Sequence, residues 1–281
     1  LHRHYRRQRQ MCIRDSKRLS SLLTLGANER TKVKTYARLA ESFKETHSID
    51  TDRGRLQFRV DSPGSVPQDP KSVRSEPETF EWIRKVLKSE DVLWDIGANI
   101  GVFSLYAALN KENKVLSLEP SAESYATLNG NIRLNGLDEY IQALCLAGDK
   151  ETNLLDLFMK DTSAGASHNS IGSSKNQFGE FDVNGYQSVI AIKLDDLDEI
   201  KGVLSPNHIK LDVDGKELEI LQGARSVLSK VDSILIEIEG INLNENLVLI
   251  EEIISNSGLE EDIDWRNKGS GRNRLYWRNK T

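Results

Sequence analysis

The sequence has few cysteines and no long apolar run. Only two cysteines, Cys12 and Cys145, occur among its 281 residues, far apart and without a CxxC spacing. This content argues against a disulfide framework and a zinc site, and it favours a reducing, cytoplasmic compartment. No stretch approaches the roughly 20 apolar residues that a membrane-spanning helix requires. We therefore expect a cytoplasmic protein with no structural metal and no membrane span.

Basic residues are concentrated at the start of the chain. The formal net charge is −5. Residues 1–16 carry five arginines and one aspartate, a charge of +4, so the remaining residues carry −9. Because binding to DNA or RNA depends on neutralising phosphates, an acidic body argues against a nucleic-acid partner.

The basic segment at residues 1–16 has three interpretations. It is rich in arginine and poor in acids, like a transit peptide, but it lacks the serine content and amphipathic period of one. It is also compatible with a nucleic-acid-binding arm. The third interpretation, which we favour, is that RRQRQMCIRDS resembles translated sequencing-adapter sequence. We therefore predict that this segment is non-native or disordered, in which case the native N-terminus is missing.

Residues 17–90 are predicted to form an N-terminal extension of helices and one short strand. Apolar residues three and four positions apart predict an amphipathic helix over 28–45, and alternation predicts a strand over 55–60. The stretch 61–77 concentrates Pro, Ser and Gly and is expected to be a loop. A second helix is expected over 77–89.

From residue 91 to residue 281 the pattern alternates between strand and helix. Strands or extended segments are predicted over 91–96, 114–120, 140–149, 189–194, 208–215, 233–239 and 272–279. Helices are predicted over 102–110, 121–136, 195–200, 216–229 and 244–258. This alternation predicts an α/β fold with a Rossmann-like, doubly wound, mostly parallel sheet and an antiparallel strand at the C-terminus. The irregular stretch 161–181 is expected to shape an acceptor pocket, because loops often carry specificity.

The first of these strands ends in LWDIGANIGVF (93–103), where Gly97 and Gly101 are four residues apart. In doubly wound sheets, ligands bind at the carboxyl ends of the strands, and glycine lets the backbone approach a ligand closely. A dinucleotide fingerprint reads GxGxxG, whereas this motif is GxxxG preceded by Asp95. A carboxylate there would repel a pyrophosphate, but it suits the ammonium and sulfonium groups of S-adenosylmethionine.

Glu119 ends the second strand, eighteen residues after Gly101. A carboxylate at this place can accept hydrogen bonds from both hydroxyls of a ribose. A glycine turn and a surface glutamate each occur by chance in many α/β proteins. The two in register predict a class I S-adenosylmethionine-dependent methyltransferase.

Five motifs follow one another along residues 91–240: DIGANIGVFSLYAA, LEPSAESYATLNGNIRLNG, IKLDDL, IKLDVDGKELEILQGA and ILIEIEG. In this order they resemble the FkbM family of methyltransferases. In that family the DxGAnxG turn and the acid after the second strand hold S-adenosylmethionine. The resemblance therefore implies that the cofactor is bound by Asp95, Gly97, Asn99, Gly101 and Glu119. It also implies O-methylation of a hydroxyl on a sugar or another natural product.

The family usually has D-V-E-G-A-E where this chain has DVDGKE (212–217), so Asp214 keeps the charge of a glutamate with a shorter reach. A calcium loop is excluded because Lys210 would occupy its first ligand position. Asp214 either caps the helix that begins at Lys216 or takes part in catalysis. Asp212 is the stronger catalytic candidate, because it ends an apolar strand where a carboxylate is costly unless it is used.

Five further side chains are weaker candidates. His168, in the irregular loop, is either a base or substrate contact or a solvated residue. Asp195 and Asp196 are expected to cap a short helix. Glu237 and Glu239 alternate with apolar residues near a strand end, so one is expected to face the site and the other not.

We expect an S-adenosylmethionine-dependent O-methyltransferase with a small-molecule or glycan acceptor. The protein would align the methyl donor with the acceptor hydroxyl, and a carboxylate or imidazole would take the hydroxyl proton. Two alternatives stay open. One is a nicotinamide-dependent sugar oxidoreductase, which the absence of GxGxxG and of a YxxxK pair disfavours. The other is a non-catalytic cofactor-binding partner module, which the altered DVDGK motif favours.

Overall fold

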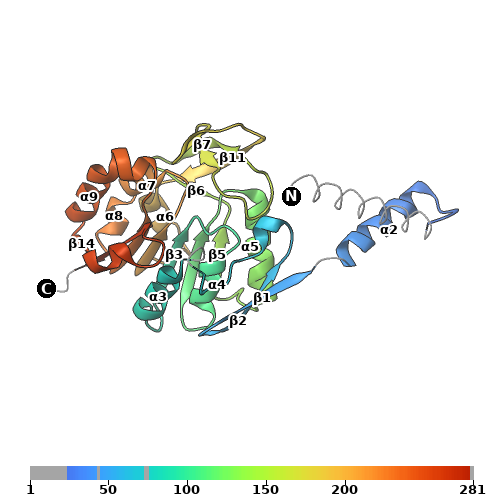
Figure 1. Cartoon of the computed structure of the whole chain (residues 1–281), viewed down its shortest axis with the longest axis horizontal. Helices are drawn as coiled ribbons and strands as arrows, with labels where there is room; N and C mark the ends of the chain where they lie inside the picture. The colour runs from blue at the N-terminus through green and yellow to red at the C-terminus, as the bar shows by residue number, and fades with distance from the viewer. Residues whose placement is uncertain (1–23, 43–44, 73–75, 279–281) are drawn as a thin grey trace. The chain divides into compact units, whose positions relative to one another are not determined.

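The computed structural model describes residues 24–42, 45–72 and 76–278. The chain separates into two compact units, with the division between Glu45 and Thr46. The N-terminal unit contains α2 (Glu29–Ser42), which agrees with the amphipathic helix predicted there (Figure 1). Residues 1–16, predicted to be non-native or disordered, lie outside the described residues.

The larger unit is built on a seven-stranded sheet in the order β14-β15-β13-β12-β3-β4-β5. Its parallel strands are β3 (Val92–Ile96), β4 (Lys114–Leu118), β5 (Ile141–Leu144), β12 (His208–Leu211) and β13 (Ser233–Glu237). At one edge, β15 (Asn273–Arg278) runs antiparallel to β13, and β14 (Leu259–Glu261) antiparallel to β15. The mostly parallel sheet and its antiparallel C-terminal strand are confirmed.

Helices cover both faces of this sheet, which makes it doubly wound. Leu93 and Trp94 are adjacent on β3 and, as alternation requires, belong to two different apolar cores. One core is completed by α3 (Pro77–Val86), α4 (Val102–Ala108) and α5 (Ala122–Leu134). The other is completed by α6 (Leu194–Asp198), α7 (Glu217–Gln222), α8 (Arg225–Leu228) and α9 (Leu247–Asn256) (Figure 1).

A β-hairpin of β1 (Thr46–Thr51) and β2 (Gly54–Arg59) packs on α5 of the larger unit. Asn131 of α5 and Asn135, the C-cap residue of this helix, accept hydrogen bonds from the backbone N–H groups of Arg59 (2.8 Å) and Gln57 (2.9 Å). The division at 45/46 therefore comes earlier than the boundary expected at 90/91. β1 was not predicted from the sequence because its stretch THSIDT is mostly polar and exposed.

A smaller sheet stands at the carboxyl edge of the large one and contains β6 (Ala147–Gly148), β11 (Gly185–Ile192), β7 (Asn153–Met159) and β8 (Ser170–Ile171). The strand predicted over 140–149 is therefore two strands, β5 and β6, in different sheets. The stretch expected to be irregular also holds a small hairpin, β9 (Lys175–Asn176) and β10 (Gly179–Glu180). The turn of this hairpin contributes to the site described below.

Two predicted helices are divided in the structure. The helix expected over 216–229 is α7 and α8, separated at Gly223, where a Cβ would lie 2.3 Å from the carbonyl oxygen of Asp149. The helix expected over 244–258 begins with a π-helical segment, η3 (Asn242–Asn246), before α9. Short 3-10 turns, η1 (Pro63–Ser65) and η4 (Ile263–Asn267), complete the elements of the described ranges.

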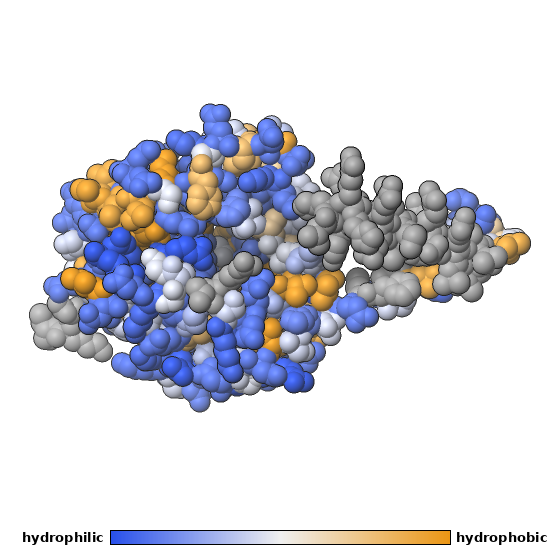
Figure 2. Space-filling view, in the orientation of Figure 1, coloured by the Kyte–Doolittle hydropathy of each residue, from blue (hydrophilic) through white to orange (hydrophobic). Residues whose placement is uncertain are grey.

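The visible surface is mainly hydrophilic, with apolar atoms gathered over α9 (Figure 2). Val248 and Leu249 of that helix are among the exposed apolar side chains. Of the helices that the structure describes, none has the length and apolar character needed to cross a membrane.

Candidate active site

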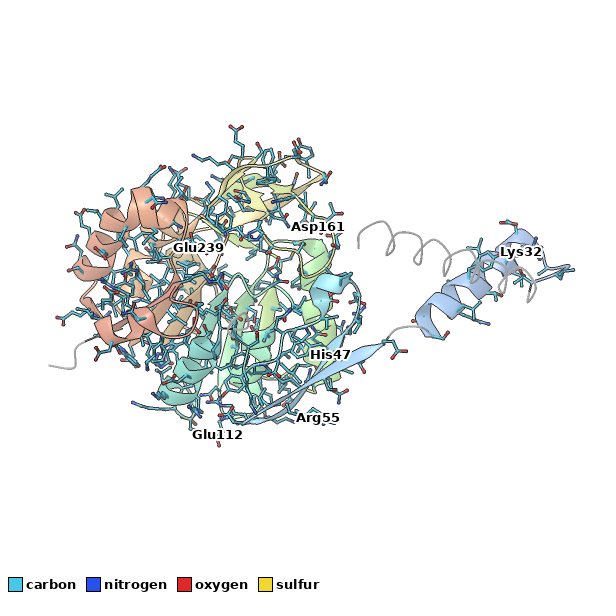
Figure 3. The ribbon with its side chains drawn as sticks, in the orientation of Figure 1. Lys32, His47, Arg55, Glu112, Asp161 and Glu239 are labelled. Carbon is cyan, nitrogen blue, oxygen red and sulfur yellow. The ribbon has the colours of Figure 1, made fainter. Side chains whose placement is uncertain are left out.

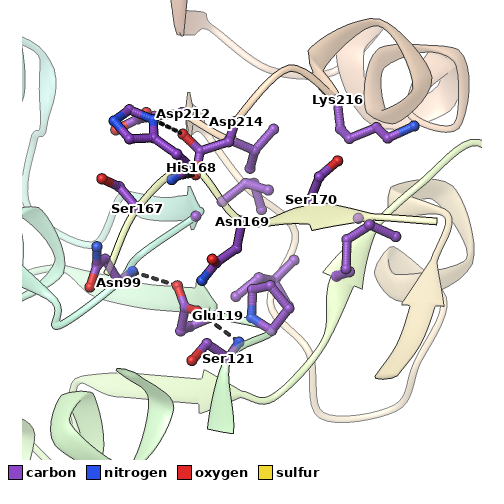
Figure 4. Close-up of a pocket in the computed structure, with 18 of the residues that line it drawn as sticks. Asn99, Glu119, Ser121, Ser167, His168, Asn169, Ser170, Asp212, Asp214 and Lys216 are labelled. Carbon is purple, nitrogen blue, oxygen red and sulfur yellow. Dashed lines mark hydrogen bonds and ion pairs between the residues drawn. The ribbon is translucent and has the colours of Figure 1, made fainter. Parts of the chain in front are cut away.

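A cavity of about 370 Å³ opens at the carboxyl ends of β3, β4, β12 and β13. Of the residues singled out from the sequence, it is lined by Gly97, Asn99, Glu119, His168, Asp212, Asp214, Glu237 and Glu239. In the close-up, His168, Asp212 and Asp214 gather on one side of the cavity, and Glu119 and Ser121 on the opposite side (Figure 4). The site therefore has two ends of different chemistry.

Glu119 is held rigidly at one end of the cavity. Its Oε2 accepts the backbone N–H of Asn99 and its Oε1 that of Ser121, each at 2.8 Å (Figure 4). Ser121 is also the predicted N-cap of α5, and its side chain accepts the N–H of Ser124. Burial raises the pKa of Glu119 to about 7, although the two backbone donors lower it. Each carboxylate oxygen keeps a lone pair for a ligand hydroxyl.

Gly97 and Gly101 are required by the packing of the chain itself. Both have positive φ, 84° and 90°. A Cβ on Gly97 would lie 1.9 Å from the carbonyl oxygen of Asp212, and one on Gly101 would lie 2.3 Å from Leu128 of α5. The N–H of Gly97 donates to Leu118 at 3.0 Å. Gly97 lines the cavity, whereas Gly101 lies behind its wall.

Asp95 also lies behind the cavity wall and is fully buried. Its carboxylate accepts a hydrogen bond from Ser104 of α4 at 2.5 Å, and it lies 3.6 Å from Nζ of Lys210. The sequence predicted that this carboxylate faces a positively charged ligand. In the structure its nearest positive charge is a lysine from the neighbouring strand.

Lys210 joins Asp95 to Asp212, because its Nζ lies 2.8 Å from Asp212 Oδ2. Burial would lower the pKa of Lys210, but Asp212, Asp95 and Glu76 outweigh burial and raise it. Burial would likewise raise the pKa of Asp212, but Lys210 and a hydrogen bond from Glu237 hold it low. A charged Lys210–Asp212 pair therefore lies at the end of β12, with Asp212 lining the cavity and Lys210 buried beside it.

Glu237 and Glu239 both line the cavity, so the expectation that only one would face it is wrong. Strict alternation fails because β13 ends at Glu237. Burial, the charge of Asp212 and a hydrogen bond to Asp212 raise the pKa of Glu237 to about 11. Glu237 is therefore protonated at neutral pH. Arg272 lies 2.8 Å from Glu237 Oε1 and 3.7 Å from Glu239 Oε2.

The C-terminal segment and the start of α3 add residues that were not singled out from the sequence. Arg272 also lies 3.3 Å from Glu76, a cavity residue whose pKa is raised by burial and by the charge of Asp212. No sequence signal pairs positions 76 and 272. Lys210 did carry a signal, since it is a charged residue within the apolar strand HIKL. Within the described ranges no cluster of three or more His, Cys, Asp or Glu is arranged to hold a metal ion.

Asp214 faces the loop across the cavity and does not cap α7. The N-cap of α7 is Lys216, without a side-chain capping bond, so the capping interpretation of Asp214 is wrong. Its carboxylate instead accepts the backbone N–H of His168 and lies 3.3 Å from His168 Nδ1. It also accepts a hydrogen bond from Gln177 Nε2 at 3.0 Å.

The β9–β10 hairpin covers the cavity through its turn residue Gln177. A Cβ on Gly215 would lie 2.8 Å from the backbone nitrogen of Gln177, and one on Gly240 would lie 2.2 Å from its carbonyl oxygen. The N–H of Ile241 donates to that oxygen at 3.0 Å. The two glycines thus form a seat for the hairpin backbone. Gln177 was not singled out from the sequence, because the turn lies in a stretch without periodicity.

Asp195 and Asp196 stand apart from the site, and neither caps α6. Asp195 accepts the N–H of Val227 in α8 at 3.0 Å, and Asp196 accepts a hydrogen bond from Thr152 at 2.6 Å. The prediction that these residues cap the short helix α6 is wrong, because the backbone N–H that Asp195 accepts belongs to α8. These two carboxylates join neighbouring elements and have a structural role.

The chain matches one family model and resembles known proteins. A family model described as the methyltransferase FkbM domain matches residues 95–261. Hexuronic acid methyltransferase AglP of Haloferax volcanii is 25% identical over 186 residues, which are 65% of this chain and 70% of that protein.

Solved structures of methyltransferases also resemble the chain at low identity. The SAM-dependent methyltransferase from Agrobacterium tumefaciens is 13% identical, with 84% of this chain and 71% of that one covered and a TM-score of 0.46. M. jannaschii TYW2 in complex with AdoMet is 14% identical, with 84% and 87% covered and a TM-score of 0.43. The family match itself spans more than half of the chain. The protein belongs to the FkbM family of methyltransferases, and its methyl donor is S-adenosylmethionine.

Proposed function

We propose that this methyltransferase transfers the methyl group to a hydroxyl oxygen of a sugar. One observation carries the proposal: a single cavity joins Glu119, fixed by two backbone N–H groups, to an acid-rich end formed by Asp212, Glu237 and Glu239. Carboxylates form strong, charge-assisted hydrogen bonds with hydroxyl groups. The cavity therefore offers acceptors to two sets of hydroxyls, those of a ribose and those of a sugar acceptor.

The Glu119 end suits the cofactor. Both oxygens of Glu119 are already oriented by Asn99 and Ser121, so the ribose hydroxyls would meet a preorganised carboxylate. S-adenosylmethionine supplies a methyl group on a sulfonium. Gly97 lines the same wall. We propose that Asp95 and Gly101, which lie behind it, support the cofactor by shaping the turn after β3.

The opposite end suits the acceptor. The paired charge of Lys210 keeps Asp212 ionised, so Asp212 is a strong hydrogen-bond acceptor and a weak proton acceptor. We propose that Asp212 orients the acceptor hydroxyl and that Asp214 acts through its contacts with the covering loop. Protonated Glu237 and charged Arg272 would bind neighbouring oxygens of the acceptor.

The class of acceptor is supported by a relative and by charge. AglP, 25% identical to this chain, is a hexuronic acid methyltransferase. The acid-rich walls disfavour a phosphate backbone, which supports a sugar over a nucleic acid. A low cysteine content, with Cys145 a free thiol, supports a cytoplasmic setting.

The test is turnover with sugar acceptors. The protein and S-adenosylmethionine would be incubated with neutral hexosides, uronic acid glycosides and a short RNA, and release of S-adenosylhomocysteine would be measured. We expect turnover with a sugar and a product whose methyl carbon is bonded to oxygen by NMR. A methyl group on nitrogen or carbon, or turnover with RNA alone, would contradict the proposal.

Asp212→Asn tests the orienting role. The substitution keeps the shape of the side chain and removes its charge. Affinity for S-adenosylhomocysteine should stay within a few-fold, and kcat should fall by about 10²-fold because misplacing a reactant has that effect. A kcat equal to that of the parent protein would remove Asp212 from the reaction.

A further inference from the structure

His168 is held in a strained backbone conformation at the cavity. Its φ is 66°, in the left-handed region that non-glycine residues avoid. Such a conformation is strained and persists only where the surroundings fix it. Here Asp214 accepts the backbone N–H of His168, and Asn176 Nδ2 donates to its carbonyl oxygen at 2.9 Å. These hydrogen bonds on both sides of His168 therefore fix its backbone in the left-handed conformation.

The imidazole of His168 is oriented by the same carboxylate. Its Nδ1 is buried and lies 3.3 Å from Asp214 Oδ1 (Figure 4). The side chain as a whole is 42% exposed and lines the cavity. The ring of Phe178 packs edge-on against it, with centroids 5.4 Å apart. Because Nδ1 is covered, the accessible edge of the ring is the one that carries Nε2.

We propose that His168 is the general base of methyl transfer and that Asp214 is its positioning residue. This inference rests on the proposed O-methylation. Asp214 would hold the ring proton on Nδ1, which leaves the Nε2 lone pair toward the acceptor. As the acceptor oxygen forms its bond to the methyl carbon, the carbon–sulfur bond breaks and its electron pair stays on sulfur. The hydroxyl proton passes to Nε2, and the resulting imidazolium later releases it to solvent.

The surrounding charges favour His168 over Asp212 for this role. Asp212 is ion-paired with Lys210 at 2.8 Å, which weakens it as a proton acceptor. Around His168, the Asp214 carboxylate, 3.3 Å from Nδ1, raises the pKa of the imidazole above its ordinary value, against the effect of burial. Lys160 opposes this rise and Glu239 adds to it. A base that titrates near the working pH is the efficient one.

The first test needs no acceptor. In the whole protein labelled with 15N-histidine, NMR should show neutral His168 protonated on Nδ1, and Asp214→Asn should lower its pKa. A parent spectrum with the proton on Nε2 would overturn the proposal, because Nε2 would then have no lone pair to offer. This outcome is independent of which acceptor the enzyme uses.

The second test measures catalysis with whichever acceptor supports turnover. Asn tolerates left-handed φ, so His168→Asn should fold and bind S-adenosylhomocysteine normally while kcat falls by about 10²–10⁴-fold. The pH–rate profile of this variant should lack the rising limb that the parent protein shows. In His168→Gly, added imidazole should restore part of the rate. His47, on the β1–β2 hairpin away from Glu239 (Figure 3), provides the control His47→Asn.

The outcomes separate the two proposals. A parent protein that methylates only nitrogen or carbon contradicts O-methylation, whatever His168 does. Normal turnover in His168→Asn, or an unchanged rising limb, overturns the role of His168 even when the product is an O-methyl sugar. Loss of cofactor affinity in His168→Asn would show a structural role instead.

Discussion

Lys210 Nζ lies 2.8 Å from Asp212 Oδ2, and the lysine side chain is almost completely buried. The same ammonium lies 3.6 Å from Asp95 and 4.9 Å from the centroid of the Phe103 ring. One cation therefore balances two carboxylates at the junction of β3 and β12, directly under the acceptor end of the cavity.

Replacing this lysine should destabilise the fold strongly. Lys210→Met would leave Asp95 and Asp212 facing each other without a positive charge, and breaking a buried pair typically costs about 3–5 kcal/mol. Lys85→Met is the matched control, because Lys85 is 54% exposed and pairs with Glu81 on the surface of α3. The Lys85→Met change should lower the free energy of unfolding by about 1 kcal/mol or less. Urea unfolding of both variants measures the difference, and equal losses would contradict the inference.

Gly97 is expected to tolerate no side chain. In Gly97→Ala the Cβ would meet the Asp212 carbonyl oxygen at 1.9 Å, so β12 must shift. We expect a loss of about 3 kcal/mol or more, from left-handed strain together with overpacking. Gly136→Ala is the control, since Gly136 also has positive φ but has open space around its Cβ position. It should cost about 1–2 kcal/mol. Thermal unfolding that gives the same loss for both would argue against the clash.

Glu119 should control cofactor affinity. Glu119→Gln replaces one carboxyl oxygen with an amide nitrogen that cannot accept a hydrogen bond from a ribose hydroxyl, so affinity for S-adenosylhomocysteine should fall by about 1.5–3 kcal/mol. The control is Glu123→Ala. Glu123 lies in the first turn of α5, and its side chain is exposed. Calorimetric titration compares the two. Unchanged affinity in Glu119→Gln would remove this residue from the cofactor site.

The protonation of Glu237 gives a pH-dependent prediction. The pKa of this side chain is raised from 4.5 to about 11 in the folded protein. Between these values the folded state holds a proton that the unfolded state has released, so stability falls as pH rises. Glu237→Gln keeps a donor for Asp212 and an acceptor for Arg272 but has no proton to lose.

The free energy of unfolding of the variant, relative to that of the parent, should therefore increase as the pH is raised from 5 to 9. The increase should be at most about 1.4 kcal/mol for each pH unit. Urea unfolding at the two pH values checks this. A difference that does not change with pH would mean that Glu237 is ionised in the folded protein.

Much of the fold could be predicted because local patterns agree with it. The alternation of strand and helix from residue 91 onward, the turn at Gly97 and the acid at Glu119 are all local features. Their positions at strand ends were enough to place them at one edge of the sheet.

The charge network could not be predicted, because it depends on residues far apart in the chain. Arg272 contacts Glu76 from almost two hundred positions away. The pairing of Asp214 with His168 depends on a loop that has no periodicity and on a left-handed backbone at His168. The sequence shows that Asp95 ends a strand, but it does not show that Lys210 Nζ lies 3.6 Å from its carboxylate.

The seat formed by Gly215 and Gly240 bears on which positions of the covering hairpin can vary. The covering hairpin rests on this seat through the backbone of Gln177, and the side chain of Gln177 also donates a hydrogen bond to Asp214 at 3.0 Å. Phe178, the next residue, is 64% exposed. A substitution at Phe178 would leave the backbone contacts of the hairpin with this seat in place, and we expect it to change only the surface that the hairpin presents beside His168.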